Sequence, residues 1–182
     1  MLRRVRMAMA AATVVAAGWS GLALAQSEEP AKAPASTPAG SISSRSGHFA
    51  AGGCLGFTVS PDLFAGQAGA EYYVTNEVAF GPLFQGGTGS GGSFWSLAGM
   101  VKYSAALRNT EKVRPYGEVG IGFANLYFDD VNRGKQKTSF IFPIGGGGEF
   151  ELTDQVTLDA NILFDVSEDV FVGLYFGGRY LF

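Results

Sequence analysis

The C-terminal residues form an alternating pattern that predicts a β-strand running to the end of the chain. Large apolar side chains occupy every second position from Val170 to Phe182, interrupted only by Gly178, while Arg179 and several glycines lie on the opposite face. A soluble protein rarely ends a strand on an exposed Phe. Transmembrane β-barrels commonly do, because the terminal aromatic ring lies in the interfacial region of the bilayer. This strand therefore predicts a membrane-embedded sheet.

The first 25 residues have the pattern of a secretory signal peptide. Three arginines occur by residue 6, an Ala-rich apolar stretch covers residues 7–17, and Ala23-Leu24-Ala25 forms a small-x-small cleavage site. A retained anchor helix is the alternative, although Gly18 and Ser20 interrupt the apolar stretch. The signal predicts export, and no stretch after it approaches the ~20 apolar residues of a transmembrane helix.

Residues 26–46 are rich in Ser, Ala and Pro and have almost no large apolar side chain, which predicts a disordered periplasmic linker. Residues 47–182 then form one domain. Removal of three arginines and no acid with the signal would change the formal net charge from −3 to −6. That charge argues against nucleic acid as a partner.

Period-two patterns between turn signals predict eight strands and an all-β fold. Gly accounts for 27 of 182 residues and aromatics for 13%, a composition that suits barrel strands. The strands are expected at residues 48–59, 64–74, 77–85, 93–105, 113–128, 137–152, 155–165 and 169–182. Most of them reach the ~9–11 residues that a tilted strand needs to cross the hydrocarbon layer.

The side-chain volumes decide which face of the sheet lies inside. The apolar faces are long and aromatic on nearly every strand, whereas the opposite faces are rich in Gly and carry charges. An eight-stranded barrel has an interior only wide enough for side chains, so it cannot hold this aromatic bulk. We therefore predict an eight-stranded antiparallel transmembrane up-and-down barrel with Trp95 and Tyr103 in the interfacial girdles. A soluble calyx with its apolar face inside is the alternative.

Two internal motifs and the final strand resemble the small outer-membrane β-barrel family, the opacity-protein and OmpA-like group. The motifs are residues 114–122 (RPYGEVGIG) and residues 146–156 (GGGEFELTDQV), and the resemblance covers residues 47–182. It implies a Gram-negative outer-membrane location, contact with the barrel-assembly machinery through a C-terminal signal that includes Tyr180 and Phe182, and a periplasmic N-terminus. Pro82 and Pro143 fall inside expected strands, which predicts local bulges there.

With that orientation, the inward residues divide the lumen into two halves. The periplasmic half is expected to be charged and the outer half apolar, with Cys54 near mid-height. The charged positions are His48, Glu71, Glu77, Lys102, Arg114, Glu118, Glu149, Glu151, Asp159 and Arg179. The apolar positions are Leu83, Phe94, Met100, Leu126, Phe128, Ile141, Leu163, Phe171 and Tyr175.

Each half has two interpretations. The charged half is either a cross-strand ion network or a path for protons or ions; the network is favoured because buried charges persist only when paired. Arg114 with Glu149 and Arg179 with Asp159 are the expected pairs, since their strands are neighbours. The apolar half is either a packed core or a cup for a small hydrophobic ligand, and packing is favoured.

Catalysis, cofactors and metal sites are not indicated. His48 is the single histidine and Cys54 the single cysteine, so neither a His-assisted nucleophile nor a metal-ligand spacing is present. The segment 132–137 carries three positive charges, which suits either contact with lipopolysaccharide phosphates or a solvated hairpin tip. We expect a monomer surrounded by outer-membrane lipids. Two functions remain open: a non-catalytic protein for envelope integrity or surface interactions, and a barrel that binds or passes small hydrophobic molecules.

Overall fold

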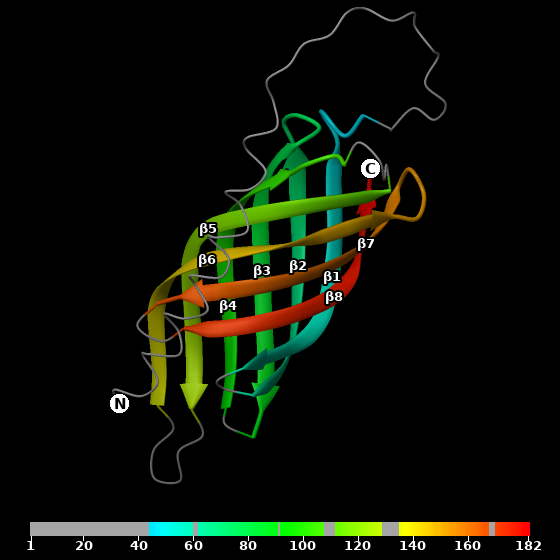
Figure 1. Ribbon diagram of the computed structural model, residues 1–182. Helices are drawn as coiled ribbons and strands as arrows, with labels where there is room; N and C mark the ends of the chain where they lie inside the picture. Colours follow the sequence, from blue (N-terminus) through cyan, green and yellow to red (C-terminus); the bar gives the residue numbers. More distant parts are fainter. Residues whose placement is uncertain (1–43, 60–61, 91, 108–111, 129–134, 168–169) are drawn as a thin grey trace, which may run out of the picture. The chain divides into compact units, whose positions relative to one another are not determined.

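The protein forms a closed barrel of eight antiparallel strands in which each strand pairs with its neighbours in the sequence (Figure 1). The computed structural model describes residues 44–59, 62–90, 92–107, 112–128, 135–167 and 170–182. The strands are β1 (Phe49–Val59), β2 (Leu63–Tyr73), β3 (Val78–Gly89), β4 (Gly92–Ser104), β5 (Val113–Phe128), β6 (Lys135–Glu151), β7 (Val156–Val166) and β8 (Phe171–Leu181). Within these described ranges, no helix is long and apolar enough to cross a membrane.

The strand pattern confirms the predicted fold class. The largest difference between the predicted and the observed strand bounds lies at the end of β3. The sequence predicted that this strand ends at Gln85, before a stretch of Gly, Ser and Thr. In the structure, the residues from Gly86 to Gly89 continue the ladder opposite those from Gly92 to Trp95. Glycine has a low intrinsic preference for strands, so composition alone misses an extension that the neighbouring strand imposes.

The two ends of the sheet are joined by β1 and β8. Their register runs from Ala50 opposite Leu181 to Val59 opposite Val172. Beyond it, the amide of Phe182 donates to the carbonyl of Phe49 at 2.7 Å, and His48 Nδ1 donates to the carbonyl of Phe182 at 2.7 Å. The C-terminal strand thus closes the barrel and leaves no unpaired edge.

The two prolines inside strands interrupt hydrogen bonding without producing the predicted bulges. Pairing between β2 and β3 skips the positions around Pro82, and pairing between β5 and β6 skips those around Pro143. On both sides of each gap the register is unchanged, so no extra residue is inserted, and the bulge prediction is wrong. Each proline lacks an N–H toward one neighbour only, while its pairing with the other neighbour, Gly99 or Asp165, continues.

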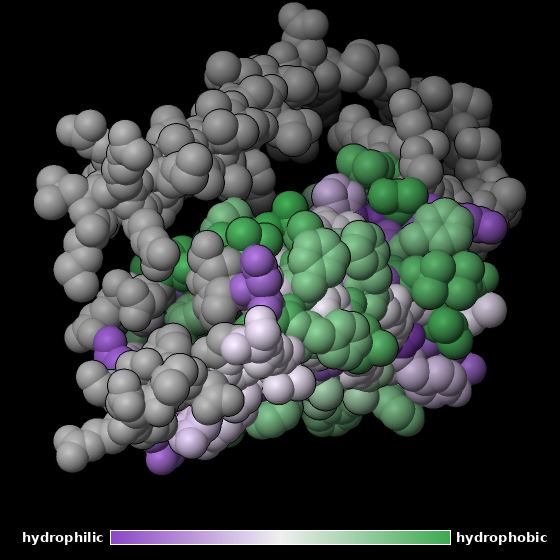
Figure 2. Space-filling model, turned by 90° about the horizontal axis from the view of Figure 1, so that it is seen from below, coloured by the Kyte–Doolittle hydropathy of each residue, from purple (hydrophilic) through white to green (hydrophobic). Residues whose placement is uncertain are grey.

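The large apolar side chains point outward, as predicted. Phe49, Leu55, Phe140 and Phe176 each expose more than half of their surface. Figure 2 shows groups of hydrophobic side chains over the described wall. At the end of the final strand, the rings of Tyr180 and Phe182 meet edge to face with centroids 4.9 Å apart. A soluble calyx would bury these faces, so this arrangement supports the transmembrane barrel.

Inward glycines allow the neighbouring strands to approach closely, and this gives a first prediction. A Cβ at Gly56 would lie 1.8 Å from the carbonyl oxygen of Leu174, whereas a Cβ at the outward Gly99 would have no neighbour within 4 Å. Gly56→Ala should therefore destabilise the barrel by about 1–3 kcal/mol, because backbone must shift. The measurement is the temperature at which the compact band in unboiled gel samples is lost. Gly99→Ala is the matched control, and equal unfolding temperatures for the two variants would contradict the close approach.

Candidate functional site

The charged half of the lumen is built around Glu149, whose side chain is completely buried. Its carboxylate accepts from Arg45 at 2.5 Å, from Lys102, and from Arg179 at 3.3 Å. Charge-assisted hydrogen bonds of this kind are stronger than neutral ones. Glu149 is therefore the centre of the charged half.

Three further acids complete what we call the ion network. Glu71 contacts Arg179 at 2.5 Å and Lys102 at 3.2 Å. Glu151 contacts Arg45 at 2.8 Å and Arg114 at 2.9 Å, while Asp159 contacts Arg179 at 2.7 Å. Tyr116 adds a hydroxyl that donates to Asp159 at 2.7 Å. The network consists of four cations and four acids: Arg45, Lys102, Arg114, Arg179, Glu71, Glu149, Glu151 and Asp159.

Arg45 belongs to this network although the sequence placed it in the linker. The side-chain oxygen of Asn76 accepts from the amides of Arg45 at 2.9 Å and Ser46 at 3.2 Å. Gly47 follows with a φ of +83°, which turns the chain toward β1. Burial acts to lower the pKa of Arg45, but the Glu149 carboxylate and other acids outweigh it and raise the pKa, so the guanidinium stays charged. The folded domain therefore includes residues 44–46.

The two expected ion pairs have different outcomes. Arg179 meets Asp159 at 2.7 Å. Arg114 lies opposite Glu149 in the register of β5 and β6, but its guanidinium contacts Glu151 instead. The carboxylate of Glu149 is already occupied by the three other cations, so the expected pairing of Arg114 with Glu149 is wrong.

Two charged residues expected in the lumen lie outside it. His48 is exposed at the start of β1, where its ring binds the carbonyl of Phe182. Glu77 is exposed in the turn between β2 and β3, where it accepts from the Thr75 hydroxyl at 3.1 Å. Alternation extended past the ends of a strand assigned both to the wrong side.

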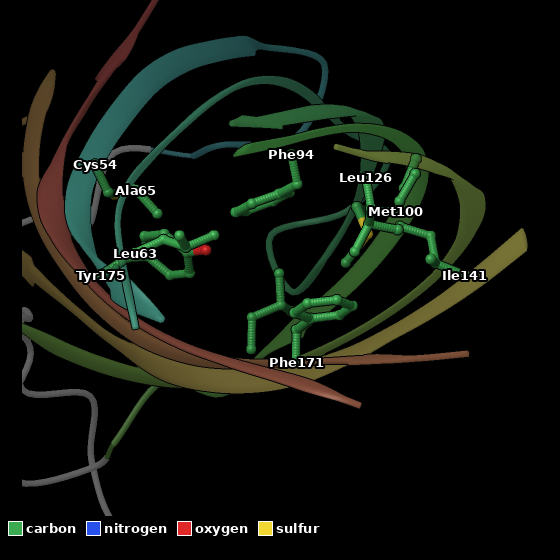
Figure 3. Close-up of a cluster of buried hydrophobic side chains, with 12 residues drawn as sticks. Cys54, Leu63, Ala65, Phe94, Met100, Leu126, Ile141, Phe171 and Tyr175 are labelled. Atoms are coloured by element: carbon green, nitrogen blue, oxygen red, sulfur yellow. The ribbon is translucent and has the colours of Figure 1, made fainter. Parts of the chain in front are cut away.

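The other half of the lumen holds a packed apolar cluster (Figure 3). Phe94 and Phe171 reach across the lumen and stack with centroids 6.2 Å apart. Leu83 is partly buried against the cluster, and the side chain of Phe128 lies outside the described part of the structure. The apolar cluster consists of Cys54, Leu63, Ala65, Phe94, Ala98, Met100, Ala124, Leu126, Ile141, Leu163, Phe171 and Tyr175.

Sequence reasoning missed a set of buried polar side chains that lie beside the apolar cluster, as Asp165 does opposite Phe171. Gln85 donates to the carboxylate of Asp165 at 3.3 Å and accepts from the Tyr175 hydroxyl at 3.2 Å. We call Gln67, Gln85, Ser96, Asn161 and Asp165 the polar layer; all are buried. Alternation places these residues on the inward face, but it does not show which polar side chains meet across the lumen.

The described residues contain no group of three His, Cys, Asp or Glu side chains that could hold a metal ion. Cys54 is buried in the apolar cluster. Of the basic segment 132–137, residues 132–134 lie outside the described part of the chain.

With this geometry in place, comparison with known proteins identifies the family. The model of the outer membrane protein beta-barrel domain matches residues 7–169, and the chain belongs to this family. The protein is therefore an outer-membrane β-barrel of a Gram-negative bacterium. No curated protein matches its sequence.

Several solved barrels share the fold at low sequence identity. The N-terminal β-barrel domain of OprF from Pseudomonas aeruginosa has a TM-score of 0.62 at 17% identity, covering 75% of this chain and 98% of that domain. Neisserial surface protein A has a TM-score of 0.58 at 18% identity, covering 74% and 96%. Ail, the attachment invasion locus protein of Yersinia pestis, has a TM-score of 0.53 at 17% identity, covering 74% and 97%. These similarities show the fold.

The central position of Glu149 gives a second prediction. Glu149→Gln should destabilise the barrel by about 3–5 kcal/mol, because it removes the buried charge that three cations share and leaves the network with one excess positive charge. Glu151→Gln is the control, since that side chain is 21% exposed and water screens the loss. The check is urea unfolding of both refolded variants. A loss for Glu149→Gln no larger than that for Glu151→Gln would show that Glu149 is not the centre of the network.

Arg45 gives a third prediction. Arg45→Ala should lower the unfolding temperature, because the Glu149 and Glu151 carboxylates lose a shared cation, and Arg45→Lys should restore part of the loss. Ser46→Ala is the control on the same segment, where an exposed hydroxyl donates to the carbonyl of Val74. The measurement is the loss of the compact gel band with temperature. If Arg45→Ala matches the wild type, residues 44–46 do not belong to the folded domain.

Proposed function

We propose that this outer-membrane barrel is a non-catalytic structural protein that supports envelope integrity. One observation carries the proposal: side chains fill the lumen in both halves, from the ion network to the apolar cluster. A closed and filled barrel adds a stable protein element to the membrane without adding an opening. In this proposal, residues 1–25 direct export and the segment that follows is a periplasmic linker.

The packing supports a closed state more than a path for solutes. A cavity in the lumen measures about 30 Å³, which is room for one or two water molecules. It touches the apolar cluster at Cys54 and Met100, rather than at the stacked rings of Phe94 and Phe171. The charges of the ion network are engaged with one another, which favours a structural role over transfer of ions.

The placement of the reactive residue types supports a non-catalytic role. His48 is held at the barrel rim by the Phe182 carbonyl, and Cys54 is buried among apolar side chains. A nucleophile needs an adjacent base within hydrogen-bond reach. His48 and Cys54 do not form such a pair, because His48 is bonded to the Phe182 carbonyl and Cys54 is packed in the apolar cluster.

A second candidate function is binding or passage of small hydrophobic molecules. It is supported by the apolar lining of one half of the lumen, where such a molecule could bind if the rings of Phe94 and Phe171 separated.

The structural proposal also includes surface interactions through the outer loops of the barrel.

The proposed partners follow from the location in the outer membrane. The outward aromatic side chains would contact lipid, and the basic segment 132–137 would contact lipopolysaccharide phosphates. The barrel-assembly machinery would recognise the final strand, which includes Tyr180 and Phe182. We propose a monomer, because the strands already form a closed sheet.

Entry of a hydrophobic fluorescent probe into cells distinguishes the two functions and is the fourth prediction. Deletion of the gene should increase probe entry and sensitivity to detergent, because the barrier is weakened, and the wild-type gene should restore both. Decreased entry with normal detergent resistance would instead identify the barrel as a route for apolar molecules. In vitro, the structural proposal predicts no saturable binding of the probe to refolded protein.

A further inference from the structure

A cavity lies between the ion network and the apolar cluster. It measures about 30 Å³ and is lined by backbone and side chains of β1 to β5 together with Arg179 of β8. Its polar lining includes Gln67, Glu71 and Glu118. The size suits a small ion accompanied by a water molecule, but not an organic ligand.

Glu118 is a buried carboxylate without a direct partner. Its exposed fraction is 8%, and among the described residues it makes no hydrogen bond or ion pair. Lys102 lies opposite Glu118 in the register of β4 and β5. The Lys102 ammonium, however, contacts Glu149 and Glu71. The cross-strand cation that could compensate Glu118 is therefore already engaged.

Gln67 provides a second and independent observation. Its side chain is 7% exposed and lines the same cavity. Its side-chain oxygen is buried and accepts no hydrogen bond from the described residues. A buried oxygen without a hydrogen-bond partner lowers the stability of the folded state by about 1–3 kcal/mol. A hydrogen-bond donor or a cation that binds this oxygen is therefore favoured at this position.

The balance of charge indicates what the ligand is. The ion network contains four cations and four acids, and Glu118 is a fifth acid beside it. A buried charge without compensation is costly, and one positive charge beside Glu118 would compensate it. Carboxylate and amide oxygens are the ligands that hard cations prefer. Arg179 also lines the cavity, but its guanidinium is neutralised by Glu71, Glu149 and Asp159.

We propose that this cavity is a binding site for one small monovalent cation, such as sodium, held by the Glu118 carboxylate and the Gln67 side-chain oxygen. Bound there, the cation links the ion network to Gln67 of the polar layer and compensates the charge of Glu118. The site goes beyond the proposed structural role, because that role requires a filled barrel but no particular ion.

The test compares refolded barrels in two salts at equal concentration and at pH 8, where solvent-exposed carboxylates are ionised. Sodium chloride supplies the probe ion, and choline chloride supplies the same ionic strength with a cation too large for the cavity. Binding to the folded state alone raises its stability. The wild type should therefore keep its compact gel band to a temperature several degrees higher in sodium than in choline.

Variants then assign the effect to the cavity. Glu118→Gln should abolish the difference between the salts, and Gln67→Leu should reduce it. Glu77→Gln makes the same chemical change at an exposed position in the turn between β2 and β3, so it should keep the full difference. Equal unfolding temperatures of the wild type in the two salts would overturn the proposal and leave water or a proton at Glu118. A full sodium effect in Glu118→Gln would overturn it as well.

Discussion

The narrow interior of a closed eight-stranded sheet determines the other features of this molecule. Such a barrel admits side chains but little else, so large aromatic residues must point toward lipid and many inward positions must be glycine. At Gly177, a Cβ would lie 2.1 Å from the carbonyl oxygen of Gly53 on the adjacent strand. The side chains that do point inward are forced against one another, and both the ion network and the apolar cluster result from this crowding.

Crowding also explains why the ion network connects strands that are not neighbours. Glu71, Lys102, Glu149 and Arg179 come from β2, β4, β6 and β8, yet their charged groups meet across the lumen. Hydrogen-bonded ladders join each strand only to the next one. The network therefore forms fully only when the sheet has closed, and it makes closure and charge compensation parts of the same event. Buried charges that meet in this way stabilise one arrangement, because removing any partner leaves another uncompensated.

Alternation in the sequence was sufficient to predict eight strands, their faces and the division of the lumen, because a two-residue period is a direct consequence of strand geometry. Alternation could not predict contacts that depend on how far a long side chain extends across the lumen. Arg45 was missed because a segment rich in Ser, Ala and Pro has no period, although one arginine in it enters the barrel. The predicted partner of Arg114 was wrong because register fixes only which Cα atoms lie side by side, whereas the long Arg114 side chain reaches Glu151 instead of Glu149, which three other cations already contact.

The wall and the lumen therefore carry different information about function. The fold is shared with barrels such as OprF and Neisserial surface protein A at only 17% and 18% identity, so very different sequences form this closed sheet. A shared fold does not specify activity, so function has to be argued from the residues inside. Among the described lumen residues the charges compensate one another except at Glu118 and at Asp165, which is bonded to Gln85, and apolar side chains pack in the other half. A barrel that conducted solutes would need a continuous polar path, whereas the polar groups of this ion network bond to one another, which supports the proposed structural role.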